Sequence, residues 1–344
     1  MDRNDLRTGF PILALTVLLH AVGVSQPGAP SHVDSEGRLY AAVFLVRGSV
    51  SGSSAGEFGV FVRADPADTN WSKITASNLF TFGLGYFEKG TTRRYYIAAG
   101  NGLHRSTDGR SGWKILTSWR TMEVLSVVPD PIDSALIYIS TSWGVFRTTD
   151  DGATWVETME GMKRWFVKML IMHPRDRRTL YATAEDDLYV TSDRGEHWTP
   201  LNVGASPVLT VHQQSADPAV ILAGIEDGGI RRTTDGGRTW KAVQGLDSAS
   251  VYTISSSPDG RQLYAAGWMT GVWRSLDEGE TWSPIWNDPA IGAVFFVYVH
   301  PSNPEHLLVG TDGQGIVESQ DGGVTWTRAG LFGGKIKQIA FYPN

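Results

Sequence analysis

Short runs of apolar and β-branched residues, broken by glycine, proline and aspartate, follow one another along most of the chain. Between residues 122 and 160 they form four groups, at 124–128, 136–140, 144–148 and 155–158. A Pro-Asp-Pro segment follows the first group, and an Asp-Asp-Gly segment precedes the last. Apolar runs separated by turn residues about every 8 to 12 positions are typical of the strands of an all-β fold.

This four-run pattern repeats with a nearly constant period. Its clearest marker is a tryptophan that recurs every 42 to 44 residues, at Trp71, Trp113, Trp155, Trp198, Trp240, Trp282 and Trp326. Four short strands in a unit of about 42 residues correspond to one blade of a β-propeller. The sequence therefore predicts an all-β, seven-bladed β-propeller with four-stranded blades.

Most copies of the repeat end in the same local motif. In the segment from Thr148 to Trp155, a hydroxyl residue is followed by Asp150, then Gly152, then the tryptophan. The aspartate can accept backbone N–H groups of its own turn, and the glycine supplies a positive φ, so the motif predicts a tight hairpin turn. The aspartates assigned to this structural role are Asp108, Asp150, Asp193, Asp235, Asp277 and Asp321.

These motifs resemble the Asp-box, or BNR, repeat. That repeat occurs in sialidases, the sortilin luminal domain, xyloglucanases and the photosystem II assembly factor family. The resemblance covers nearly everything after residue 38 and implies a propeller in which the box itself is structural. It does not identify the function, because these families share a fold and differ in activity.

The two ends of the repeat region complement each other. Residues 335–344 match the first strand of a blade, and residues 37–42 match a second strand with no first strand before it. We therefore expect the C-terminal strand to complete the first blade, which closes the ring and removes two exposed sheet edges. The propeller is assigned to residues 37–344.

The N-terminal segment has a different character. Arg3 and Arg7 precede an apolar stretch at residues 11–24, and small residues follow it. A stretch of about 14 apolar residues is too short for a permanent transmembrane helix and fits a secretory signal. We predict a signal peptide at residues 1–25, a disordered linker at 26–36, no integral membrane span, and a secreted or periplasmic protein.

Composition narrows the chemistry. The formal charge of −6 and a pI near 5.8 give no basic excess, which argues against nucleic-acid binding. The absence of cysteine excludes disulfides, thiolate metal sites and a cysteine nucleophile. His173, His212 and His300 occupy equivalent places in three blades and are interpreted as structural. We expect no cofactor, no metal and a monomer.

A binding site is expected on the face that carries the loops between blades and the loops between second and third strands. Five tryptophans outside the boxes and the third strands map there, Trp119, Trp143, Trp165, Trp268 and Trp286, and such rings suit sugars or peptides. The predicted ligand-binding residues are Trp119, Arg120, Trp143, Arg164, Trp165, Glu185, Glu226, Asp227, Trp268 and Asp312.

Two functions remain open at this point. Among the families that the repeat resembles, sialidases carry an Arg-Ile-Pro segment that is absent here, and xyloglucanases act in a cleft between two propellers. The main expectation is therefore an exported, non-catalytic scaffold that binds a protein or peptide partner, with no catalytic residues. The alternative is a carbohydrate-active protein that binds or hydrolyses a glycan, for which a glycosidase needs two facing carboxylates.

Overall fold

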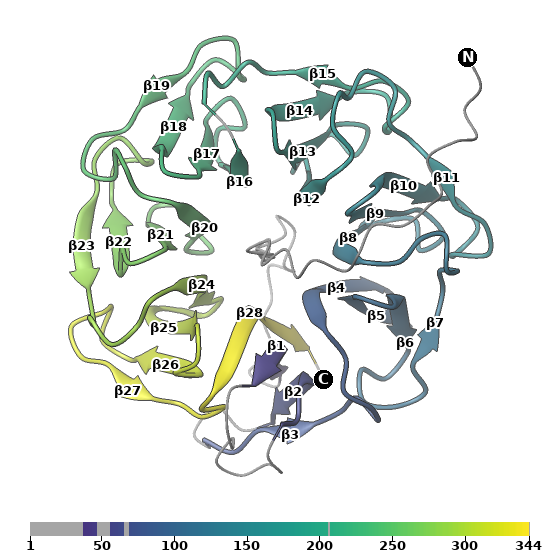
Figure 1. Ribbon diagram of the computed structural model, residues 1–344, viewed down its shortest axis with the longest axis horizontal. Helices are drawn as coiled ribbons and strands as arrows, with labels where there is room; N and C mark the ends of the chain where they lie inside the picture. Colours follow the sequence, from purple (N-terminus) through teal and green to yellow (C-terminus); the bar gives the residue numbers. More distant parts are fainter. Residues whose placement is uncertain (1–36, 47–55, 65–68, 206, 344) are drawn as a thin grey trace, which may run out of the picture.

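The protein is a seven-bladed β-propeller, which confirms the predicted fold (Figure 1). The computed structural model describes residues 37–46, 56–64, 69–205 and 207–343. Within them, each blade is a four-stranded antiparallel sheet, and the blades are arranged around a central axis. The predicted signal peptide and linker at residues 1–36 lie outside the described residues.

In each blade the strands are ordered outward from the axis as inner, second, third and outer strand. The inner strands of blades 1 to 7 are β28 (Gly334–Pro343), β4 (Thr81–Lys89), β8 (Val124–Pro129), β12 (Val167–Met172), β16 (Val208–Gln213), β20 (Val251–Ser256) and β24 (Val294–His300). The second strands, in the same order, are β1 (Gly37–Val46), β5 (Thr92–Ala99), β9 (Ile137–Thr141), β13 (Leu180–Ala184), β17 (Ile221–Ile225), β21 (Leu263–Gly267) and β25 (Asn303–Thr311).

Third and outer strands complete the blades. The third strands are β2 (Gly59–Arg63), β6 (Gly102–Ser106), β10 (Gly144–Thr148), β14 (Leu188–Thr191), β18 (Gly229–Thr233), β22 (Val272–Ser275) and β26 (Ile316–Ser319). The outer strands are β3 (Ser72–Lys73), β7 (Lys114–Ile115), β11 (Val156–Glu157), β15 (Thr199–Pro200), β19 (Lys241–Ala242), β23 (Ser283–Trp286) and β27 (Thr327–Arg328). Among the described residues, no helix is long and apolar enough to cross a membrane.

Packing between neighbouring blades explains the sequence pattern. Every residue of β12 and β13 is buried, whereas both residues of β11 are exposed. A strand that is covered on both faces needs no polar side, so it reads as a continuous apolar run rather than an alternating one. The outer strands face solvent and are shorter than the sequence predicted.

The ring closes as predicted, with β28 as the inner strand of blade 1 (Figure 1). β28 pairs antiparallel with β1 from Gly37↔Pro343 to Val46↔Gly334. Blade 1 therefore joins the two ends of the described chain. The edge of β1 that faces the axis is paired with β28 and is not exposed.

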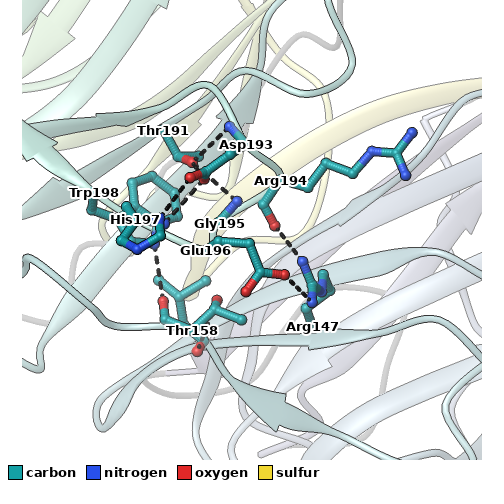
Figure 2. Close-up of polar contacts among 10 residues, drawn as sticks. Arg147, Thr158, Thr191, Asp193, Arg194, Gly195, Glu196, His197 and Trp198 are labelled. Carbon is teal, nitrogen blue, oxygen red and sulfur yellow. Dashed lines mark hydrogen bonds and ion pairs between the residues drawn. The ribbon is translucent and has the colours of Figure 1, made fainter.

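The Asp box of blade 4 shows how the motif holds its turn (Figure 2). The Thr191 hydroxyl and the His197 backbone N–H donate to Asp193 Oδ1, at 2.6 and 3.0 Å, and Gly195 has a φ of 87°. In blade 3, hydrogen bonds from Thr148 and Thr154 lower the pKa of Asp150 to about 2. In these two boxes the aspartate therefore serves as an ionised turn acceptor.

The box tryptophan also ties neighbouring blades together. Trp198 Nε1 donates to the carbonyl of Thr158, at 2.9 Å, across the boundary between blades 4 and 3 (Figure 2). Trp71 Nε1 makes the equivalent bond to the carbonyl of Ala329, at 2.8 Å, across the seam between blades 1 and 7. In these blades the box therefore stabilises the contact between blades as well as its own turn. In blades 6 and 7 the tryptophan instead donates to a glycine carbonyl of its own turn, Gly279 at 3.1 Å and Gly323 at 3.0 Å.

Replacement of Trp198 by alanine should be strongly destabilising. Its side chain is only 3% exposed, so truncation removes a large buried ring and should cost about 3 to 5 kcal/mol of unfolding free energy. Trp198→Phe is the matched control, since it keeps most of the ring and loses the bond to Thr158. Urea unfolding measures both variants; a Trp198→Ala protein as stable as the parent would contradict the role of the box.

Candidate functional site

One face of the propeller, called here the loop face, carries the loops that connect blades and the loops between second and third strands. Inner strands begin and second strands end at this face, whereas the box turns lie on the opposite face. All ten predicted ligand-binding residues occupy loops of the loop face. They are Trp119, Arg120, Trp143, Arg164, Trp165, Glu185, Glu226, Asp227, Trp268 and Asp312.

Four of these residues are exposed tryptophans. Their exposed fractions are 77% for Trp119, 58% for Trp143, 64% for Trp165 and 44% for Trp268. The Arg120 guanidinium lies over the Trp119 ring, 5.1 Å from its centroid. Large aromatic side chains so exposed on one face are unusual for packing residues and offer flat apolar surfaces to a ligand.

Trp286 is different, and its predicted place in a loop is wrong. It ends β23 and stacks on the box residue Trp326 with 5.0 Å between ring centroids. Both rings line a cavity of about 150 Å³ between blades 6 and 7, together with Arg328 and Asp288. That volume is below the range of about 300 to 1,000 Å³ that is usual for ligand pockets.

Three of the predicted carboxylates gather near the start of the inner strands. The Ser250 hydroxyl donates to Asp227 Oδ1 at 2.6 Å, and Lys335 Nζ lies 3.4 Å from Asp312 Oδ1. The pKa of Tyr252 in β20 is raised by burial first, and then by the charges of Glu226, Asp227 and Asp312. The charges of all three carboxylates therefore act on the same tyrosine, whereas Glu185 is exposed on blade 4.

Each inner strand carries a β-bulge at the end next to the loop face. In β12 the pairing with β13 passes from Val167 to Met169 and skips Lys168. The same skip occurs in every blade, and the seven skipped residues, called here the bulge ring, are Lys337, Phe82, Leu125, Lys168, Leu209, Tyr252 and Phe295. A bulge redirects its side chain, here toward the axis of the propeller.

Contacts between distant blades show that these side chains meet in the central channel. Lys168 Nζ of blade 4 lies 5.6 Å from the ring centroid of Tyr252 in blade 6, with blade 5 between them. Tyr252 stacks on Phe295 with 5.8 Å between centroids, and Lys337 Nζ lies 3.8 Å from the Phe295 centroid. Lysines and aromatic rings therefore form one cluster at the channel mouth, beside the three carboxylates.

Our sequence interpretation did not find this cluster. A signal does exist, since Phe82, Leu125 and Lys168 follow one another at intervals of 43 residues. The other five inner strands have Phe, Leu or Tyr at the bulge position. The two lysines at this position are therefore the feature of the sequence that could have identified the cluster.

Two of the repeated histidines, His173 and His300, have a structural explanation in their turns. His212 lies within β16, so its predicted equivalence to them is wrong: Gln214 occupies the equivalent place in blade 5. His173 Nδ1 accepts the backbone N–H groups of Arg175 and Asp176, at 3.1 and 3.0 Å. His300 Nδ1 accepts the Ser302 N–H at 3.3 Å in the equivalent turn of blade 7. Within the part of the chain that the structure describes, no group of three or more histidine, aspartate or glutamate residues is arranged to hold a metal ion.

Comparison with known sequences extends the resemblance. The family described as "Sortilin, neurotensin receptor 3" matches residues 143–266. A xyloglucanase from a Paenibacillus species is 27% identical over 315 residues, covering 71% of this chain and 30% of the relative. A xyloglucanase from Hypocrea jecorina is 27% identical over 266 residues, with 71% and 27% coverage. The chain thus spans about a third or less of the length of these relatives.

Solved structures agree on the fold. The GH74 xyloglucanase from Xanthomonas campestris has a TM-score of 0.65 at 16% identity, covering 85% of this chain and 56% of that one. YCF48 from Cyanidioschyzon merolae has a TM-score of 0.56 at 17% identity, covering 86% of this chain and 97% of that one. At such identities the likeness is one of fold.

These relatives correct the main functional expectation. The sequence favours a non-catalytic protein-binding scaffold on two grounds, the missing Arg-Ile-Pro segment of sialidases and a single ring in place of the two that form a xyloglucanase cleft. The xyloglucanase relatives support the alternative instead, a carbohydrate-active protein of the glycoside hydrolase type. The number of rings was a poor guide, because a single ring also presents exposed aromatic rings and carboxylates on its loop face, the groups that sugar chemistry uses.

Proposed function

This chain is a seven-bladed Asp-box propeller similar to sortilin, YCF48 and the xyloglucanases, and from that premise we propose that it acts on a polysaccharide through its loop face. In this proposal the tryptophans bind the sugar rings, and carboxylates at the channel mouth take part in hydrolysis of a glycosidic bond. A polysaccharide substrate lies outside the cell, so export by the predicted signal peptide is part of the proposal.

The observation that carries the proposal is the exposure of four tryptophans on one face. Trp143 and Trp165, 58% and 64% exposed, lie in the loop before β10 and the loop before β12, both on the loop face. A pyranose ring presents apolar C–H groups on its faces and hydroxyls at its rim, so it stacks on an indole ring without desolvating its hydroxyls. Charged residues such as Arg164 next to Trp165 are then available for those hydroxyls.

The carboxylates supply the chemistry that hydrolysis requires. One carboxyl group protonates the leaving oxygen, and a second activates water or attacks the anomeric carbon. Glu226 and Asp312 come from blades 5 and 7 on opposite sides of Tyr252 in blade 6, and Lys335 orients Asp312. This pair is our choice for the two roles, with Asp227 held in place by Ser250 beside it.

The proposal predicts that Trp165→Ala weakens glycan binding by about tenfold or more and leaves the melting temperature nearly unchanged, because the ring is exposed and few packing contacts are lost. Leu276→Ala is the matched control: Leu276 is 67% exposed in a box turn on the opposite face. Binding is measured by calorimetry on a panel of neutral and acidic polysaccharides that includes xyloglucan. Equal losses in the two variants would contradict the loop face as the binding face.

Hydrolysis is tested on the same panel by the release of reducing ends. Glu226→Gln and Asp312→Asn should each lower the rate by about a hundredfold or more, since each removes a group that the bond cleavage needs. Glu157→Gln, in the exposed outer strand β11, is the control and should retain the parent rate. A parent protein that neither binds nor cleaves any glycan of the panel would overturn the proposed function.

A further inference from the structure

The boundary between blades 6 and 7 differs from most other boundaries of the ring. At four boundaries the box tryptophan donates to a carbonyl of the neighbouring blade; these tryptophans are Trp71, Trp155, Trp198 and Trp240. Trp326 of blade 7 and Trp282 of blade 6 bond within their own turns, but Trp282 packs with Trp273 in a buried cluster. Beside Trp326 lies the cavity of about 150 Å³, next to the outer strands β23 and β27 (Figure 1).

Trp286, which lines this cavity, is unusual for its position four residues after the box tryptophan. Blades 1 to 3 have Thr75, Thr117 and Met159 there, and each of these side chains accepts a backbone N–H of the third strand of its own blade. An indole only donates, so Trp286 cannot take that role, and its ring stacks on Trp326 instead. Both tryptophans are only half-buried. The fold therefore does not need an indole at position 286, and a ligand can reach the one that is there.

The polar part of the lining has unused hydrogen-bonding capacity. Asp288 Oδ1 accepts the Ala290 N–H at 2.9 Å, whereas its Oδ2 has no partner among the described residues. The exposed Arg328 lies over the Phe332 ring, 5.3 Å from its centroid, and no carboxylate of the described chain pairs with it. The Gln314 side-chain amide makes no hydrogen bond within the same residues. A carboxylate, a guanidinium and an amide of the lining are therefore available to a ligand.

The size and chemistry of the cavity limit the kind of ligand. An engineered protein cavity of about 150 Å³ binds benzene, so a cavity of this size holds one six-membered ring. Aromatic walls suit the C–H faces of a pyranose, while the carboxylate, guanidinium and amide suit its hydroxyl groups. One carboxylate and one guanidinium carry no net charge together, so neither an acidic nor a basic ligand is favoured. A neutral sugar ring meets all of these conditions.

We propose that this cavity binds one neutral pyranose unit at the end of a glycan. Trp286 supplies the apolar contact, and the polar lining residues bind the hydroxyls. The unit is terminal because the cavity has no room for a second ring. This inference rests on the proposed function and adds a subsite to it. Gln314 follows Asp312 by two residues, at most about 7 Å of extended chain, so a glycan that ends in the cavity can continue toward the proposed hydrolytic carboxylates.

The binding is tested by NMR on protein that carries ¹⁵N in its tryptophan indoles. The probes are the methyl β-pyranosides of glucose, xylose and galactose, with cyclohexanol as a ring that lacks most of the hydroxyls. At least one pyranoside should shift the Trp286 indole signal with a Kd of about 1 mM, the weak affinity expected for a ligand of about a dozen non-hydrogen atoms. Cyclohexanol should bind about tenfold more weakly or worse, because it leaves the polar lining groups unpaired.

Three variants locate the binding. Trp286→Thr identifies the Trp286 signal by its loss and should abolish the shift of the neighbouring Trp326 signal, which Trp326→Phe identifies. It should fold normally, because blades 1 and 2 have threonine at the equivalent position. Asp288→Asn keeps an acceptor for the Ala290 N–H but loses the charge, so it should weaken pyranoside binding by about tenfold. Ile115→Thr is the matched control: Ile115 is 51% exposed in the outer strand β7, and its replacement should leave the Trp286 shift unchanged.

The other outcomes separate this inference from the proposed function. If no pyranoside moves the Trp286 signal, or cyclohexanol binds as tightly as the pyranosides, the inference is wrong while binding of the polysaccharide panel still supports the proposed function. An oligosaccharide that binds no more tightly than its methyl pyranoside would mean a site for free sugars, which also contradicts a glycan subsite. A parent that shows the Trp286 shift but neither binds nor cleaves any polysaccharide would overturn the proposed function and leave a monosaccharide site.

Discussion

A chain that ends before Lys335 is expected to lose its cooperative unfolding transition. The truncation removes β28, whose buried Ile336 and Ile339 pack with Leu39 and Ala41 of β1 in the core of blade 1. Losing one such isoleucine side chain costs about 2 to 5 kcal/mol, and a whole domain is stable by only about 5 to 15 kcal/mol. The cut also leaves β1 as an exposed inner edge, which favours aggregation.

Thermal unfolding followed by circular dichroism, together with size-exclusion chromatography, checks this result. A chain that ends at Tyr342 is the control, because it keeps the pairs from Arg38↔Tyr342 to Val46↔Gly334 and should melt as the parent does. If the long truncation melted cooperatively at the parent temperature, β28 would not be what closes the ring.

The second large effect is expected at the seam between blades 7 and 1. Arg63 of β2 and Glu318 of β26 form a bidentate ion pair, with N–O distances of 2.9 and 3.0 Å, and both side chains are buried. His306 Nε2 also contacts Glu318 Oε1 at 2.5 Å. Arg63→Met leaves a buried carboxylate whose remaining partners are His306 and Gln320, and loss of the only full positive charge beside it among the described residues should cost about 3 to 5 kcal/mol of unfolding free energy.

The matched control is the double variant Arg63→Met with Glu318→Leu. It replaces the pair by apolar side chains of similar volume, so it should recover most of the lost stability. Urea unfolding at neutral pH measures both proteins. A double variant no more stable than Arg63→Met would mean that the loss reflects the shape of Arg63 and not the unpaired charge.

The same pair gives the seam a defined dependence on pH. Burial raises the pKa of Glu318, but hydrogen bonds from His306 and Arg63 outweigh burial and lower it from 4.5 to about 2. A carboxylate with a depressed pKa stabilises the fold above its unfolded pKa, and this contribution is lost as the pH falls toward the folded value. The parent should therefore lose stability between about pH 5 and about pH 2, and the double variant should lose less.

The function of the chain was predicted less well than its fold. The same propeller occurs in xyloglucanases and in YCF48, so the repeat that identified the architecture carried no information about the partner. Our preference for a scaffold relied on the number of rings and on the missing Arg-Ile-Pro segment of sialidases. The first is a property of architecture, and the second excludes one family of enzymes only. The tryptophans of the loop face were the better evidence, because an exposed Trp165 has no structural need for its ring.

The sequence by itself determined the blades, the box turns and the closure of the ring. These features are local or periodic: a tryptophan every 42 to 44 residues, an aspartate that caps its own turn, and an unmatched strand at each end. Local hydrogen bonding and strand periodicity leave their mark on neighbouring residues, which a sequence displays directly. The tertiary structure decided what the bulge ring and the seam bring together. The 43-residue spacing marks the position of Lys168 in the sequence. Only the structure shows that the pairing with β13 skips Lys168, and that Lys168 meets Tyr252 because seven blades bring their inner strands to one axis. Arg63 and Glu318 are 255 residues apart in sequence and become partners only when the ring closes.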